Sequence, residues 1–79
     1  MPLVLLGKGK SLKLNENDHD AVSNPHPMEG KYVLAFNLMP LSIQHFIGPH
    51  GYQKFIVPKG GATIENNGEV DLTVITPGL

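Results

Sequence analysis

The chain contains no cysteine among its 79 residues. This absence excludes disulfide bonds and thiolate metal sites. A domain of this length buries about 60–65% of the surface that its unfolded chain exposes, and such domains often need further reinforcement. Partner chains or a non-thiolate metal site remain as sources of that reinforcement.

Positive charge is also scarce. The formal net charge is −1, the sequence pI is about 6.4, and all six basic residues are lysine. Proteins that bind nucleic acids present a basic surface and favour arginine for bidentate contacts. The composition therefore argues against a nucleic-acid partner.

Long apolar runs are missing as well. The N-terminal run Leu3–Leu6 is short, and Gly7 ends it. A run of this length is too short for the core of a signal peptide or for a membrane span. We therefore expect synthesis in the cytoplasm, no signal peptide and no membrane partner.

Turn-forming residues, by contrast, are abundant, with nine glycines and seven prolines. Short apolar or alternating runs recur about every ten residues with turn signals between them, which is typical of all-β domains. We predict one domain over residues 1–79, an all-β, small antiparallel sandwich, barrel or jelly-roll-like unit with an extended N-terminal arm. No internal repeat is visible in the sequence.

The expected organisation has three parts. Residues 1–14 hold two short strands, which we expect to form a hairpin. Residues 15–30 are polar and contain two prolines, so we expect an arm or loop there, and loops of this length often have a function such as docking. Residues 31–76 are expected to form an antiparallel β meander.

The last part of that meander predicts a specific hairpin over residues 62–76. A three-residue loop over residues 66–68 pairs Ile64 with Val70 and places Gly68 where a left-handed backbone is needed. The apolar residues then share one face, which should decide the register. That face consists of Ala62, Ile64, Val70, Leu72 and Val74.

Two neighbouring segments supply the candidate interface. Residues 31–39 are largely apolar on both strand faces, as expected for a central strand that is covered on both sides. Residues 41–47 alternate, and His45 lies on their apolar face, where we expect a hydrogen-bonded core or interface histidine. The candidate interface residues are Tyr32, Val33, Leu34, Phe36, His45 and Phe46.

No motif indicates catalysis, metal binding or a cofactor. The four histidines form no His-x-His pair and no HExxH frame, and the serines lie in no Gly-x-Ser-x-Gly frame. We read Asp18-His19-Asp20 as a solvated turn and His50 as a turn residue. The sequence therefore predicts a protein that is not an enzyme, with no catalytic, metal or cofactor residues.

Residues 57–68 resemble the second motif of the cupin family. Pro58, Gly60 and Asn67 match the Pro, Gly and Asn of that motif, whereas Thr63 occupies the position of its metal-binding histidine. The first cupin motif, with its His-x-His and glutamate, is absent. The resemblance implies a small, metal-free, jelly-roll-like barrel.

Three functions remain open at this point. We predict a non-enzymatic structural or interaction protein that acts as a homo-oligomer or on a larger assembly, for example a capsid decoration protein in a virus or phage virion. The alternative is a metal-free cupin-like barrel that binds a small molecule, with His45 and aromatic residues such as Tyr32, Phe36 or Phe55 lining its pocket. A third hypothesis is a subunit that docks on its partner through residues 15–30.

Overall fold

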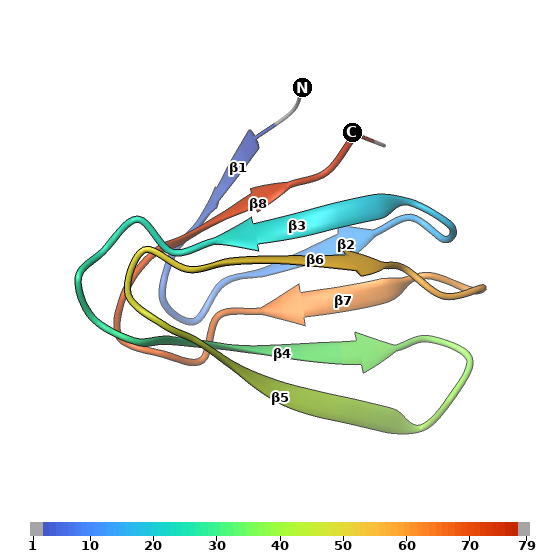
Figure 1. The fold of residues 1–79 in the computed structure, drawn as a ribbon. Coiled ribbons are helices and arrows are strands. Elements are labelled where there is room, and N and C mark those ends of the chain that lie inside the picture. Colours follow the sequence, from blue (N-terminus) through green and yellow to red (C-terminus); the bar gives the residue numbers. More distant parts are fainter. Residues whose placement is uncertain (1–2, 78–79) are drawn as a thin grey trace.

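The computed structural model describes residues 3–77, and this part of the chain folds into eight strands without a helix. Figure 1 shows their arrangement. The strands are β1 (Leu3–Leu6), β2 (Ser11–Leu14), β3 (His19–Ser23), β4 (Gly30–Phe36), β5 (Leu41–Ile47), β6 (Tyr52–Ile56), β7 (Ala62–Glu65) and β8 (Leu72–Ile75).

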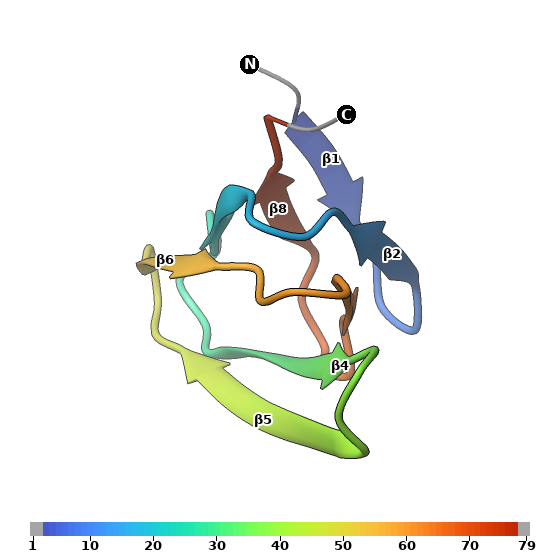
Figure 2. The same ribbon diagram turned by 90° about the vertical axis from the view of Figure 1, so that its right-hand side faces the viewer.

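The strands form two antiparallel sheets of four strands each. Sheet A has the order β1-β8-β3-β6, and sheet B has the order β2-β7-β4-β5. Every connection crosses from one sheet to the other except the turn between β4 and β5. In Figure 2, β4 and β5 of sheet B lie below β6 and β8 of sheet A. The prediction of an all-β, antiparallel sandwich is confirmed.

The core lies between the two sheets and is built from alternate residues of each strand. Val22, Leu72 and Val74 project inward from sheet A, and Tyr32 and Ile64 project inward from sheet B. All five are at most 2% exposed. Burying one such side chain contributes about 1.5–3 kcal/mol, so this shared core is the main source of stability.

The predicted hairpin over residues 62–76 is wrong, because its two strands belong to different sheets. β7 pairs with β2 and β4, so Ile64 lies beside Leu12 and Leu34 and not beside Val70. Gly68 is not among the glycines with a positive φ, which are Gly9, Gly60 and Gly61. Both arrangements bury the same apolar residues, but the crossing places them on two opposed walls of one core.

The other local pairings differ for the same reason. β1 and β2 are strands, as expected, yet they pair with β8 and β7 and form no hairpin with each other. After residue 31, only β4 and β5 pair in sequence, so no meander forms. The two sheets pack face to face because each sheet alone would leave its apolar face in water.

Residues 15–30 do not form an arm. They contain β3, which lies between β8 and β6 inside sheet A. Ala21 and Val22 are buried, and so is Asp20, which overturns the solvated turn predicted there. Two central apolar residues suffice for this strand, because neighbouring strands satisfy its backbone on both edges.

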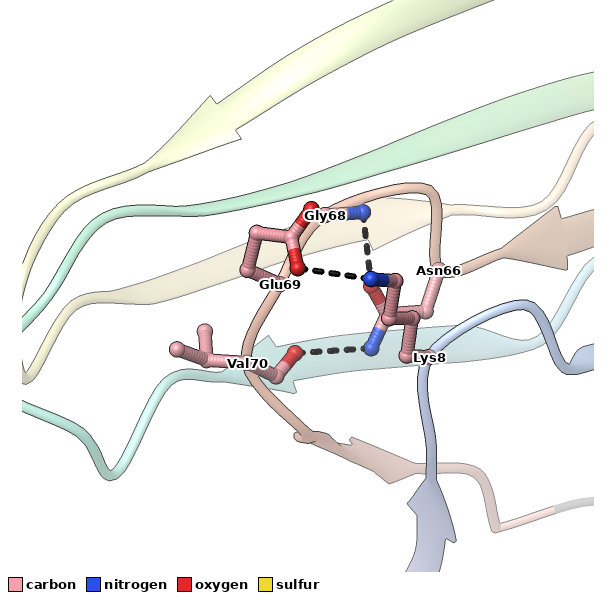
Figure 3. A network of polar contacts seen from close by, with 5 residues as sticks. All are labelled: Lys8, Asn66, Gly68, Glu69 and Val70. Carbon is pink, nitrogen blue, oxygen red and sulfur yellow. Dashed lines mark hydrogen bonds and ion pairs between the residues drawn. The ribbon is translucent and has the colours of Figure 1, made fainter.

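A buried asparagine stabilises the crossing from β7 to β8 (Figure 3). Asn66 is fully buried, and its Nδ2 donates to the carbonyl oxygens of Leu6 at 2.9 Å and Val70 at 2.8 Å. Its Oδ1 accepts from the backbone N of Gly68 at 3.0 Å. The side chain thus satisfies backbone groups that would otherwise be buried without partners.

A second asparagine makes the same contacts at the crossing from β3 to β4. Asn24 Nδ2 donates to the carbonyl of Met28, four residues later, and to that of Ile47, the last residue of β5. Asn24 Oδ1 accepts from the backbone N of His26, two residues later. Asn66 has the corresponding partners: Gly68 two residues later, Val70 four residues later, and Leu6, which is the last residue of β1.

The turns beside these asparagines also match. Lys10 N donates to Gly7 O at 3.0 Å, and Gly51 N donates to Gly48 O at 2.9 Å. The carbonyls of Lys10 and Gly51 then accept from the backbone N of Asn66 and Asn24, respectively. Strands β1–β4 and β5–β8 are therefore two halves with equivalent contacts, a repeat that the sequence does not reveal.

Candidate interaction surfaces

The four histidines occupy separate parts of the structure. His19 is exposed at the start of β3, His26 lies in the β3–β4 crossing, and His50 lies in the β5–β6 turn with a φ of 55°. His45 faces inward from β5, and its ring stacks on Tyr32 with centroids 5.0 Å apart. No three His, Asp or Glu side chains within residues 3–77 form a group that could hold a metal ion.

Two carboxylates lie close together at the start of β3. Burial raises the pKa of Asp20 above its ordinary 3.8, and the charge of Asp18 raises that pKa further. The Thr76 side chain and His19 act in the opposite direction. Neither Asp20 oxygen has a partner at full hydrogen-bond geometry among residues 3–77, so the desolvation cost of the carboxylate outweighs the favourable effects of Thr76 and His19.

Tyr32 ties the two sheets together inside this core. Its hydroxyl donates to Gln53 Oε1, and Gln53 Nε2 donates in turn to the Phe46 carbonyl at 2.9 Å. Burial raises the pKa of the Tyr32 phenol, so the group stays neutral and serves as a donor. These contacts give Tyr32 a structural role.

The outer face of sheet B is polar, as expected for a sheet face in water. Glu65 projects from the inner strand β7 and Lys13 from the edge strand β2, and Lys31 Nζ lies 5.7 Å from the centroid of the Phe46 ring. The outward-facing residues are Ser11, Lys13, Lys31, Val33, Ala35, Ser42, Gln44, Phe46, Thr63 and Glu65. Thr63 therefore faces outward, away from the interior of the sandwich.

The outer face of sheet A is apolar, and we call it the apolar face. Leu5 is 70% exposed and Ile56 is 62% exposed, and Lys54 is the one strongly basic residue there. The register places the following residues on this face: Leu3, Leu5, His19, Ala21, Ser23, Tyr52, Lys54, Ile56, Thr73 and Ile75. The contrast with sheet B marks the apolar face as a surface that prefers to be covered.

A hollow of about 460 Å³ lies on the apolar face. Ala21 forms part of its lining because a small side chain there leaves space between larger neighbours on β6 and β8. The lining residues are His19, Asp20, Ala21, Tyr52, Lys54, Phe55, Ile56, Ile75 and Pro77. The hollow contains one aromatic residue of the pocket expected from sequence, Phe55, and neither His45, Tyr32 nor Phe36.

The candidate interface residues predicted from sequence are divided between core and surface. Tyr32 and Leu34 are core residues, and Phe36 is partly buried against the same core. Phe46 is exposed on the outer face of sheet B, and Val33 is half-buried beside it. The two-sided apolar pattern of β4 therefore reflects one face in the core and one small apolar area outside.

Sequence reasoning missed the apolar face. In β6, Tyr52 and Ile56 alternate with Gln53 and Phe55, so both strand faces mix polar and apolar residues. Alternation alone could not show which set points outward. The one signal was the absence of any charge in Leu3–Leu6, outward-facing positions included.

Comparison of the chain with family models, with curated proteins and with solved structures finds no match. No helix of the described residues is long and apolar enough to span a membrane.

Proposed function

We propose that the chain is a non-enzymatic structural protein that works by binding other protein chains, as a homo-oligomer or as part of a larger assembly. The observation that carries this proposal is the apolar face of sheet A. Leu3, Leu5, Tyr52 and Ile56 are all more than half exposed there, whereas the opposite sheet carries charged and polar side chains. Apolar patches of this kind mark protein contacts.

The order of the strands supports a jelly-roll architecture. The orders 1-8-3-6 and 2-7-4-5 are those of two interlocked Greek keys in two facing sheets of four strands. Jelly rolls occur in viral capsid proteins, lectins and cupins. A decoration protein on a virus or phage capsid is one function that combines this architecture with a face for docking, and here the warrant is analogy of fold.

A charge placed on the apolar face tests the proposal. Leu5→Lys and Ile56→Lys should lower the mass of the assembled species, because each buries a charge in the contact. Ser11→Lys is the matched control, since Ser11 lies on an edge strand of the polar sheet. Light scattering from micromolar to millimolar concentration measures the mass, and circular dichroism checks the fold.

The expected result is a wild-type species heavier than one chain that Ser11→Lys leaves unchanged. Dye binding by 8-anilinonaphthalene-1-sulfonate should also fall in the two apolar-face variants. A wild-type chain that stays monomeric throughout, or an assembly that tolerates both apolar-face charges, would refute the role of this face.

A second candidate function is the binding of a small molecule in the hollow around Ala21. Its volume of about 460 Å³ lies within the range of ligand pockets, and Lys54 and His19 supply polar groups at its edge. A fragment screen by NMR would support this function if its hits shifted the Ala21 and Lys54 signals and Ala21→Leu abolished those shifts.

A further inference from the structure

The open edge of β5 has backbone groups without partners. β5 ends sheet B, and β4 is its one partner strand among residues 3–77. The Phe46 carbonyl accepts from Gln53 Nε2, so it points away from β4. Because an antiparallel residue directs its N–H and C=O to the same side, Ser42 and Gln44 also point away from β4.

The opposite edge of β4 supports this assignment. Asn37 N donates to Gly61 O at 3.1 Å, on the side of β7. Odd-numbered residues of β4 therefore face β7, and even-numbered ones face β5. In the β4–β5 register, Leu34 pairs with Ile43 and Tyr32 with His45, so the odd residues of β5 bond to β4. The four backbone groups of Ser42 and Gln44 are left at the open edge.

This edge lacks the features that usually prevent strand pairing. The sequence LSIQHFI has no charged residue, no proline and no glycine, and its seven residues pair with β4 without a bulge. The other three edge strands, β1, β2 and β6, are shorter, and β2 and β6 also carry Lys13 and Lys54, respectively. Soluble proteins protect long edges with charges, prolines or bulges, so an unprotected edge of this length indicates a strand that pairs.

The free groups are complementary to themselves under a twofold axis. If Ser42 pairs with Gln44 of a second copy, the four free groups of each chain yield four hydrogen bonds, and Ile43 lies opposite its own copy. The alternative register, with Gln44 opposite Gln44, would use the Phe46 carbonyl that Gln53 already occupies. The first register therefore pairs all four backbone groups of Ser42 and Gln44 and leaves the Gln53–Phe46 hydrogen bond in place.

The same register covers exposed apolar side chains. Leu41 is 47% exposed and Ile43 is 40% exposed, although both lie on the inward face of sheet B. Their exposure follows from their place on the last strand, where the core is open at its side. The second copy brings its own Ile43 and His45 against these residues, and no charged side chain lies in β5 to repel its copy.

We propose that two copies of this chain pair antiparallel along β5, with Ile43 on the twofold axis, to form one eight-stranded sheet. This inference rests on the proposed function, because it names a partner and an edge for the assembly. The β5 contact and the apolar face are separate surfaces, on sheet B and sheet A. A chain that uses both builds assemblies larger than a dimer.

A cysteine cross-link tests the register. The chain has no cysteine, so Ile43→Cys introduces a single thiol. In the proposed pair the two Cα atoms lie about 4.5 Å apart, within the range that a disulfide spans. Mild oxidation should convert most of this variant to a covalent dimer. Ser11→Cys, exposed on the opposite edge strand β2, is the control and should give little dimer.

A proline tests the edge itself. Gln44→Pro removes an N–H that points away from β4, a position at which an edge strand tolerates proline. The fold should survive, as judged by circular dichroism, while the dissociation constant of the dimer rises about tenfold or more. Gln44→Ala is the matched control and should leave the constant unchanged.

The outcomes separate the two proposals. A dimer that forms equally in Gln44→Pro, or Ile43→Cys that cross-links no more than Ser11→Cys, overturns the β5 pairing and leaves the apolar face standing. A wild-type chain that is monomeric at all concentrations overturns both the β5 pairing and the homo-oligomer form of the proposed function. Loss of dimer in Gln44→Pro with persistent effects of Ile56→Lys supports both.

Discussion

Replacing Asn66 with alanine is the most direct test of how the fold is held together. The fully buried side chain makes three hydrogen bonds, to Leu6, Val70 and Gly68. Each such bond contributes about 1 kcal/mol net, and its loss costs more when the remaining partner stays buried. We expect Asn66→Ala to lower the free energy of unfolding by about 3 kcal/mol.

That loss is large for a domain of this size. At about 0.05–0.15 kcal/mol per residue, 79 residues give about 4–12 kcal/mol of total stability. With a urea m-value of about 1–1.5 kcal/mol per M, the midpoint should fall by about 2–3 M while the m-value stays the same. Urea titration followed by far-ultraviolet circular dichroism measures both quantities.

The neighbouring residue provides the control. Asn67 is exposed, so Asn67→Ala should change the free energy of unfolding by less than about 0.5 kcal/mol. Asn24→Ala should cost about as much as Asn66→Ala, because Asn24 makes the equivalent contacts. Equal midpoints for Asn66→Ala and Asn67→Ala would show that the buried amide does not hold the crossing.

Three further predictions concern charge and backbone. The raised pKa of Asp20 means that this carboxyl group binds its proton more tightly in the folded state than in the unfolded state. The stability that the protonated group contributes is fully present at a pH below the unfolded pKa of 3.8, and it is lost as the pH rises through the folded pKa. Asp20→Asn should therefore raise the urea midpoint at pH 7 and leave it unchanged near pH 3.5. Gly60→Ala should destabilise the protein by about 1–3 kcal/mol more than Gly48→Ala, since Gly60 has a φ of 91° and no free space for a Cβ. Lys8→Ala should not shift the midpoint measurably at physiological salt, because its ion pair with Glu69 is exposed, although Lys8 lowers the pKa of Glu69.

Each of these predictions has a distinct contrary result. A midpoint difference between wild type and Asp20→Asn that grows toward low pH would reverse the assigned sign. Equal stabilities for Gly60→Ala and Gly48→Ala would mean that the backbone relaxes at Gly60. A salt-sensitive loss of stability in Lys8→Ala would show that the surface pair contributes more than its exposure implies.

The alternation of apolar and polar residues in the sequence revealed one part of the candidate surfaces and hid the rest. Alternation in β5 was visible in the sequence, and it placed Ile43 and His45 on one face. That β5 is an edge strand was not visible, because an edge depends on which strands are absent beside it. The apolar face of sheet A was hidden for the same reason: four strands from distant parts of the chain contribute to it.

The sequence by itself determined the local elements. Glycine and proline positions and short alternating runs located strands within residues 1–14, 31–39, 41–47 and 62–76, because turn chemistry and period-two patterns act over a few residues. It also determined the class, all-β and antiparallel, and left a sandwich, a barrel and a jelly-roll-like unit as alternatives. The exception was β3, where polar neighbours masked two buried residues, Ala21 and Val22.

Only the tertiary structure decided the partners of those strands. Residues 62–76 can bury the same apolar side chains as a hairpin or as two strands in opposite sheets, so the local pattern is equally compatible with both. The choice depends on contacts over long distances in the chain, such as Asn66 with Leu6 and Asn24 with Ile47. Those contacts exist only once both sheets have assembled, which is why the topology, the open β5 edge and the apolar face emerge together.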